Sequence, residues 1–179
     1  MTDVQKVKDA FFNKQVRCAL LCEVFCEKTN DQLKKFQEEF ANDSNNAHTH
    51  KEDTQPVALT QYVTKMIADK SVRSFLTRVL ADPYTRADLS DRENSTSVDT
   101  TRAEDDAAKL QVKKLKPEVF LDVFLGEGGS MTFSQVIETV DKFGGEDDFI
   151  EKLEDSFGSP FQDLCVRYIE FALKTENPV

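Results

Sequence analysis

The sequence predicts an all-α protein made of antiparallel helix hairpins, arranged as a HEAT-like array or an orthogonal bundle. Three observations lead to this prediction. Apolar residues recur at every third or fourth position through most of the chain, and runs that alternate strictly between apolar and polar residues are absent. Glycine and proline, which are frequent in the turns of sheet-rich folds, number only 6 and 5 among 179 residues. We expect a single domain over residues 1–179, with polar loops at 42–55 and 84–101.

The first two predicted helices form a hairpin. The first covers residues 3–28 and is apolar on most of its faces between Val16 and Cys26, as expected for a helix that packs on more than one side. Thr29 and Asn30 are good capping residues for the second helix. A short polar turn between two helices is typical of an antiparallel pair. The apolar stripe of the second helix consists of Leu33, Phe36, Phe40 and Ala41.

Two further helices follow the polar loop at 42–55. Pro56 suits the first turn of a helix that runs to about Asp69. Either Asp69 or Ser71 can cap the next helix, and Asp82-Pro83 should end it, because a residue before proline avoids helical geometry. The residues expected to face the core are Leu59, Tyr62, Val63, Met66 and Ile67 in the third helix and Val72, Phe75, Leu76, Val79 and Leu80 in the fourth.

The helices predicted in the second half of the chain are separated by proline and glycine. They are expected over residues 102–115, 117–125, 133–143, 147–156 and 161–173. Gly144-Gly145 should end the helix that begins at Phe133, since glycine is common just after a helix C-terminus. The helix after this pair opens with three acidic residues, which the helix dipole stabilises.

The net charge of −10, from 23 basic and 33 acidic residues, argues against direct nucleic-acid binding, which relies on Lys and Arg to neutralise phosphates. The most basic stretch holds Lys109, Lys113, Lys114 and Lys116. Acidic residues lie just upstream, so we interpret this stretch as a dipolar surface helix. No apolar run approaches the roughly 18 to 20 residues that span a bilayer, and the first residues lack a signal-peptide pattern. We therefore expect protein partners, no membrane contact and an intracellular location, either cytoplasmic or nuclear.

Cysteine and histidine are the residue types here that could carry chemistry. The chain contains Cys18, Cys22, Cys26, Cys165, His48 and His50. Three cysteines along one helix face span too much axial length to share one metal, so we interpret all four as core residues and leave a redox role open. The histidines lie in a polar loop that gives a metal or a nucleophile little preorganisation. We assign no catalytic residue, no metal ligand and no cofactor.

The glycine-rich turn before Phe133 allows two interpretations. The run Gly129-Ser130-Met131-Thr132-Phe133 is similar to the middle of an EF-hand loop, which would then cover residues 124–135. A calcium loop needs oxygen ligands at its first, third, fifth and twelfth positions. Those positions are held by Phe124, Gly126, Gly128 and Gln135. The first three bring no side-chain oxygen, so the segment is either a plain turn between helices or a degenerate, calcium-free EF-hand-like loop.

Two segments of the chain resemble a known family. They lie within residues 16–40 and 117–171, and their most characteristic runs are Phe25-Cys26-Glu27-Lys28-Thr29-Asn30-Asp31 and Thr132-Phe133-Ser134-Gln135-Val136-Ile137-Glu138-Thr139-Val140-Asp141-Lys142-Phe143. Together they resemble the last helical-repeat domain of the large subunit of the nuclear cap-binding complex. The resemblance implies antiparallel helix hairpins and a scaffold that contacts proteins in RNA metabolism. It transfers no site residue, and residues 42–116 have no counterpart in it.

These observations predict a non-catalytic helical domain that binds protein partners as a scaffold, and not an enzyme. The resemblance adds RNA metabolism as the setting. The alternative is a regulatory module with the degenerate EF-hand-like loop at 124–135. An enzyme of unrecognised type is the third hypothesis, and it would require several perturbed carboxylates or thiols in one deep pocket.

Overall fold

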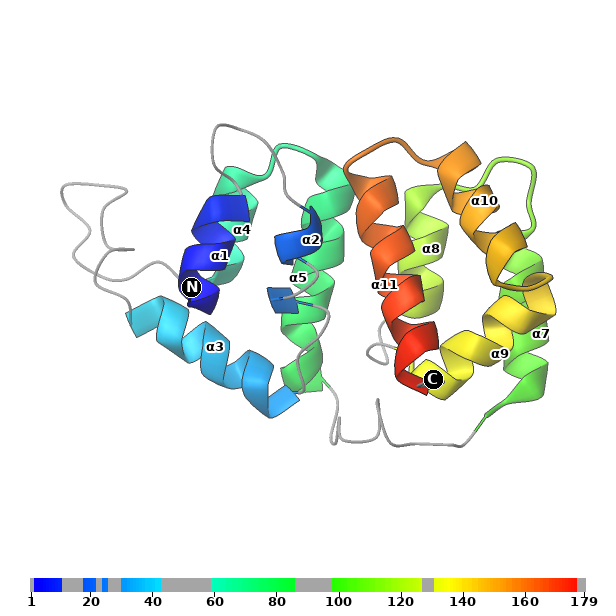
Figure 1. Ribbon diagram of the computed structural model, residues 1–179, viewed down its shortest axis with the longest axis horizontal. Helices are drawn as coiled ribbons and strands as arrows, with labels where there is room; N and C mark the ends of the chain where they lie inside the picture. The colour runs from blue at the N-terminus through cyan, green and yellow to red at the C-terminus, as the bar shows by residue number, and fades with distance from the viewer. Residues whose placement is uncertain are drawn as a thin grey trace.

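The computed structural model describes residues 2–10, 18–21, 24–25, 30–42, 59–85, 98–126 and 131–176. Within these ranges all regular secondary structure is helical, which confirms the predicted all-α class (Figure 1). In the same ranges, no helix combines the length and the apolar character needed to cross a membrane.

The helices form two groups that lie side by side in Figure 1. The N-terminal half consists of α1 (Asp3–Ala10), α2 (Cys18–Leu21), α3 (Asn30–Asn42), α4 (Leu59–Met66) and α5 (Lys70–Thr85). The C-terminal half consists of α7 (Thr100–Leu110), α8 (Pro117–Phe124), α9 (Phe133–Phe143), α10 (Glu146–Ser156) and α11 (Phe161–Glu176). Within the C-terminal half α7 packs most extensively on α9, and α9 also packs on α11.

One apolar core runs through both halves, and α5 and α11 meet at their junction (Figure 1). The ring of Phe75 is fully buried and makes edge contacts with Phe161 and Tyr168, at centroid distances of 6.4 and 5.8 Å. A polar link reinforces the same junction. Arg78 Nη1 donates to Asp122 Oδ1 at 2.9 Å and to the carbonyl oxygen of Leu125 at 3.3 Å. The two halves therefore share one packed interior.

Several predicted helix ends are confirmed. Asp69 caps α5, because its Oδ1 accepts hydrogen bonds from the amides of Ser71 and Val72 at 2.9 and 3.0 Å. Gly144 and Gly145 end α9 with φ angles of 136° and 107°, a region that side chains with a Cβ rarely adopt. The predicted stripe of α3 is also found, since Leu33, Phe36 and Phe40 are buried and Ala41 is half-buried.

The prediction of one helix over 3–28 is wrong. Helices α1 and α2 pack against each other, whereas a straight helix would hold residues 10 and 18 about 12 Å apart. Helices α1 and α2 therefore bury part of each other's surface. Residues 11–17 and 26–29 lie outside the described part of the chain.

Three smaller predictions also need correction. Helix α5 continues to Thr85, two residues beyond Pro83, because proline's fixed φ is itself helical and only one amide donor is lost. Met66 does not face the core, since it lies at the end of α4 and is 48% exposed. The charged helix predicted over 102–115 begins earlier and ends at Leu110, so that the lysines beyond Lys109 lie in the connector to α8.

The two predicted polar loops are narrower than expected wherever the structure describes them. Residue 42 is the last residue of α3, residues 84 and 85 belong to α5, and residues 100 and 101 belong to α7. The rest of the first loop and residues 86–97 of the second lie outside the described ranges.

Candidate functional site

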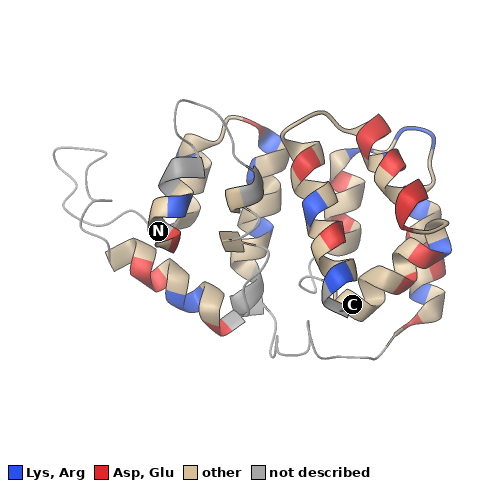
Figure 2. Ribbon diagram, viewed as in Figure 1, with Lys and Arg blue, Asp and Glu red and all other residues tan. Residues whose placement is uncertain are grey.

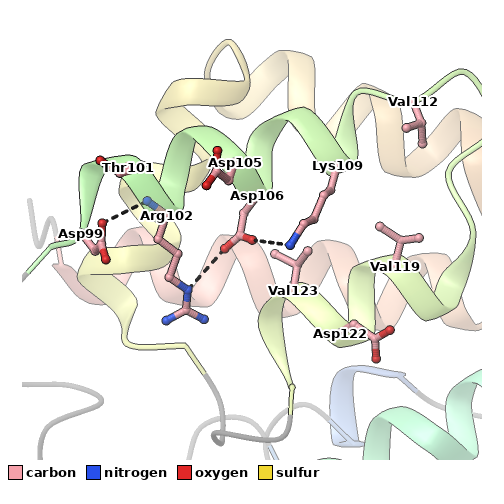
Figure 3. A pocket seen from close by; sticks show the side chains of 10 residues that line it. All are labelled: Asp99, Thr101, Arg102, Asp105, Asp106, Lys109, Val112, Val119, Asp122 and Val123. Carbon is pink, nitrogen blue, oxygen red and sulfur yellow. Dashed lines mark hydrogen bonds and ion pairs between the residues drawn. The ribbon is translucent and has the colours of Figure 1, made fainter.

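A groove lies between α7 and α8, on the outer side of the C-terminal half (Figure 3). It encloses about 830 Å³, a volume within the usual range of binding pockets. Its lining residues are Asp99, Thr101, Arg102, Asp105, Asp106, Lys109, Val112, Val119, Asp122 and Val123. Two smaller hollows, of about 330 and 280 Å³, lie between α9 and α11 and along α11.

The start of α7 is held in place by its cap residue and by a side chain of α9. Asp99 caps α7 by accepting a hydrogen bond from the amide of Arg102 at 3.0 Å. The buried side chain of Gln135 in α9 pairs with the backbone of Asp99. Its Oε1 accepts from the Asp99 amide at 2.8 Å, and its Nε2 donates to the Asp99 carbonyl oxygen at 2.9 Å. This double contact fixes where α7 begins, and so it fixes the acidic end of the groove.

The opposite wall is set by how α8 packs. Phe120 and Phe124 are fully buried on the inner face of this helix. Val119 and Asp122 are left at the groove, where Asp122 remains largely exposed although it pairs with Arg78. At the far end of α7, Lys152 Nζ in α10 donates to the carbonyl oxygen of Val112 at 2.7 Å. That bond positions the backbone at Val112, whose side chain is 43% exposed.

Asp106 is the buried acid of the groove. Its side chain is 9% exposed and lies between two cations, with Arg102 Nε at 3.4 Å from Oδ2 and Lys109 Nζ at 3.6 Å from Oδ1 (Figure 3). Oδ2 is buried and has no hydrogen-bond partner among the described residues, because the Arg102 contact is an ion pair without hydrogen-bond geometry. The acid therefore engages both cations that line the groove but keeps unused hydrogen-bonding capacity.

The groove belongs to the acidic half of the molecule. Residues 98–179 contain 18 acidic and 9 basic residues, a net charge of −9, whereas residues 1–97 contain 15 and 14, a net charge of −1. In Figure 2, much of the ribbon of α10 and part of α7 is coloured as acidic residues. Among the groove residues themselves, four aspartates outnumber one arginine and one lysine. A positively charged ligand is therefore favoured at this surface.

The structure tests only part of the cysteine and histidine interpretation. Cys165 is fully buried in α11, in agreement with its predicted place in the core. Cys18 belongs to α2, while Cys22, Cys26 and both histidines lie outside the described part of the chain. In the part of the chain that is described, no three His, Cys, Asp or Glu side chains are grouped so that they could hold a metal ion.

The structure also places most of the EF-hand-like register. Helices α8 and α9 flank it, and the amide of Met131 donates to the carbonyl oxygen of Phe124 at 2.9 Å. Phe124, at the first position, is a fully buried ring. Gln135, at the twelfth position, is hydrogen-bonded to the backbone of Asp99, the residue just before α7. Gly128 lies outside the described ranges. Gln135 thus serves the contact between α7 and α9.

Sequence reasoning missed this groove and the pairing of Asp99 with Gln135. One signal was present: Asp99 is a good capping residue just before a helical stretch. A second was Val112, an apolar residue among lysines. Neither signal could show that α7 would pack on α9, because the two helices are separated by the whole of α8.

Comparison with known proteins finds no family model that matches this chain, and no curated protein matches its sequence. The function is therefore inferred from the geometry and charge of the groove.

Proposed function

We propose that this chain is a non-catalytic helical interaction domain, a scaffold module, that binds a partner protein in the groove between α7 and α8. The observation that supports the proposal is an apolar strip lined by carboxylates. Val112, Val119 and Val123 form the strip, in which Val112 is exposed, Val119 is half-buried and Val123 is 6% exposed, and aspartates from both helices border it. Such a combination of an apolar centre and a polar rim is typical of protein interfaces.

The strip matters because of where its valines lie. One exposed valine is ordinary on a protein surface, but Val112 shares a hollow with two other valines. It is also held in that position by the bond from Lys152 to its carbonyl oxygen. Burying such a strip under a partner provides favourable free energy, whereas the charged rim selects which partner fits.

The setting in RNA metabolism is proposed on the resemblance to the last helical-repeat domain of the cap-binding complex. The resembling segments include α3, α8 and α9. The extensive packing of α7 on α9, two helices further along the chain, is compatible with both a HEAT-like array and an orthogonal bundle, since neighbouring hairpins of a solenoid also pack on each other.

A regulatory module descended from a calcium sensor is the weaker proposal. It is supported only by the presence of α8 and α9 as consecutive helices on either side of residues 125–132. It is disfavoured by Gln135, whose amide is paired with Asp99 instead of facing the loop.

Site-specific photocrosslinking tests the proposed function. A photoreactive amino acid is placed at Val112 in the full chain, and in a control at Ala68, an exposed position between α4 and α5. In extract of the native source, we expect position 112 to crosslink to a specific protein, and excess unlabelled chain to compete with this reaction. Equal labelling from both positions, or no competed product at 112, would contradict the proposal.

A further inference from the structure

We infer that the groove binds a basic amphipathic helix of a partner protein, whose apolar stripe covers the valine strip and whose Lys or Arg side chains pair with the aspartates of α7 and α8. The inference rests on the proposed function and adds the chemistry of the partner. Two observations carry it: the charge balance of the groove and the ion pair of Asp106 with the exposed side chain of Lys109.

The charge balance favours a cationic occupant. Arg102 and Lys109 are both engaged by Asp106, so they contribute little positive potential at the rim. Asp105 is exposed and makes no ion pair within the described residues, and Asp122 is 70% exposed at its side chain despite its pair with Arg78. A second copy of this chain that docked by the same acidic face would be repelled from this rim.

Asp106 provides a specific anchor. Lys109 is a flexible side chain that is 65% exposed and lies 3.6 Å from the Asp106 carboxylate. A cation of the partner can replace it at the carboxylate, and the displaced ammonium group then returns to solvent. A charge-assisted hydrogen bond formed in this partly desolvated place is stronger than one on an open surface.

The length of α7, which forms one wall of the groove, suits one short helix. Helix α7 has 11 residues, which corresponds to a length of about 16 Å, or three turns. An amphipathic helix that docks between two others places side chains from positions i, i+3, i+4 and i+7 on one face. The exposed Val112 and the half-buried Val119 offer such a stripe its apolar contacts.

Peptide binding to the full chain tests the inference. The probe is a fluorescein-labelled helical peptide of three to four turns, with leucine on one face and lysine or arginine elsewhere, measured by fluorescence anisotropy. Two control peptides replace its cations by glutamate or scramble its order. We expect binding of the basic amphipathic peptide, weaker binding of the scrambled one and none of the acidic one. Binding of the acidic peptide, or equal binding of the scrambled one, would overturn the inference.

Variants of opposite sign separate the groove from general charge attraction. Asp106→Asn should weaken binding about tenfold, whereas Lys109→Ala should strengthen it because a competing cation is removed. Val112→Ser should weaken it about threefold through lost apolar contact. The matched controls Asp155→Asn and Lys142→Ala change the charge equally but lie outside the groove. If these controls shift the affinity as much as the groove variants do, the inference is wrong.

Thermal unfolding of each variant shows whether it is folded. If Asp106→Asn is unstable, the expected gain in peptide affinity of Lys109→Ala still tests the inference. Light scattering of the wild-type chain at high concentration addresses self-association. If the wild-type chain forms a dimer and Val112→Ser dissociates it, the occupant of the groove is a second copy of the chain and the inference is wrong. A position-specific crosslink at 112 combined with no binding of the basic peptide would retain the proposed function and overturn this inference.

Discussion

The N-terminal and C-terminal halves of the molecule bury apolar side chains in the same way but differ in charge. Both build their interiors from phenylalanine and branched aliphatic residues on helical stripes, and both contribute to one core. Residues 1–97 are close to neutral, with a net charge of −1, whereas residues 98–179 carry −9. The comparison teaches that this way of packing helices does not require acidic charge, since the N-terminal half packs in the same way and is nearly neutral.

Net charge bears on solubility and partners more than on fold. The half that carries the charge is also the half with the groove between α7 and α8. We therefore attribute stability to the shared core and partner selection to the surface of the C-terminal half. The predictions below separate these two roles, beginning with the largest expected effect.

Phe75→Ala tests whether the two halves share a core. Phe75 is fully buried and contacts two rings of α11 across the junction. Removing such a ring costs about 3–5 kcal/mol of unfolding free energy. Urea denaturation followed by circular dichroism should show a single transition at lower urea for the variant, and a smaller loss for Phe75→Leu. Two separate transitions, of which Phe75→Ala shifts only one, would show that the halves fold independently.

Gln135→Met tests the contact that fixes the start of α7. The variant keeps the side-chain length but leaves the backbone amide and carbonyl of Asp99 without the Gln135 partner. We expect a loss of about 1–3 kcal/mol and faster hydrogen exchange at the first turn of α7.

Gln111→Met is the matched control for this contact, because Gln111 also bonds a backbone carbonyl, that of Phe143, but on the exposed surface. Its effect should be smaller. An equal effect of the two variants would mean that burial adds nothing to the Gln135 pairing.

Two helix caps allow a direct comparison of the halves. Asp69 caps α5 and Asp99 caps α7, so replacement of either by alanine should cost about 1 kcal/mol of unfolding free energy. Only Asp99 lines the groove, so only Asp99→Ala should also weaken binding of the basic peptide. If Asp69→Ala weakens peptide binding as much as Asp99→Ala does, the peptide does not bind specifically in the groove.

The smallest expected effect concerns Tyr62 of α4. Burial raises the pKa of its phenol above the ordinary value of 10.0, because the charged form is poorly solvated there. A pKa that is higher in the folded state makes stability fall as pH rises above 10 toward that higher pKa. Relative to the wild type, Tyr62→Phe should gain unfolding free energy between pH 9 and pH 11. An unchanged difference across this range would contradict the burial effect.

The sequence was sufficient for the class of fold and for features that depend on neighbouring residues. The stripe of α3, the cap at Asp69 and the glycine end of α9 each follow from residues within one turn of one another. The single helix over 3–28 was wrong because periodicity alone cannot show whether an apolar stretch turns back on itself. Pro83 was misjudged because one missing amide near a helix end is a modest loss.

The candidate site could not be predicted because it depends on contacts between distant residues. Asp99 and Gln135 are 36 residues apart in the sequence, and no local pattern records which helix Gln135 faces. In the same way, Val112 lies in the connector after α7 and Val119 lies in α8, so their meeting in one hollow follows only from the packing of α7 and α8.

The central claim is that a partner binds in the groove of the acidic half. The most direct measurement is an NMR titration of the isotope-labelled full chain with the basic amphipathic peptide. We predict that amide signals shift along α7 from Arg102, at Val112 in the connector and along the facing part of α8, while those of α3 and α4 stay in place. Shifts confined to the N-terminal half, or spread evenly over the acidic surface of α10, would contradict the claim.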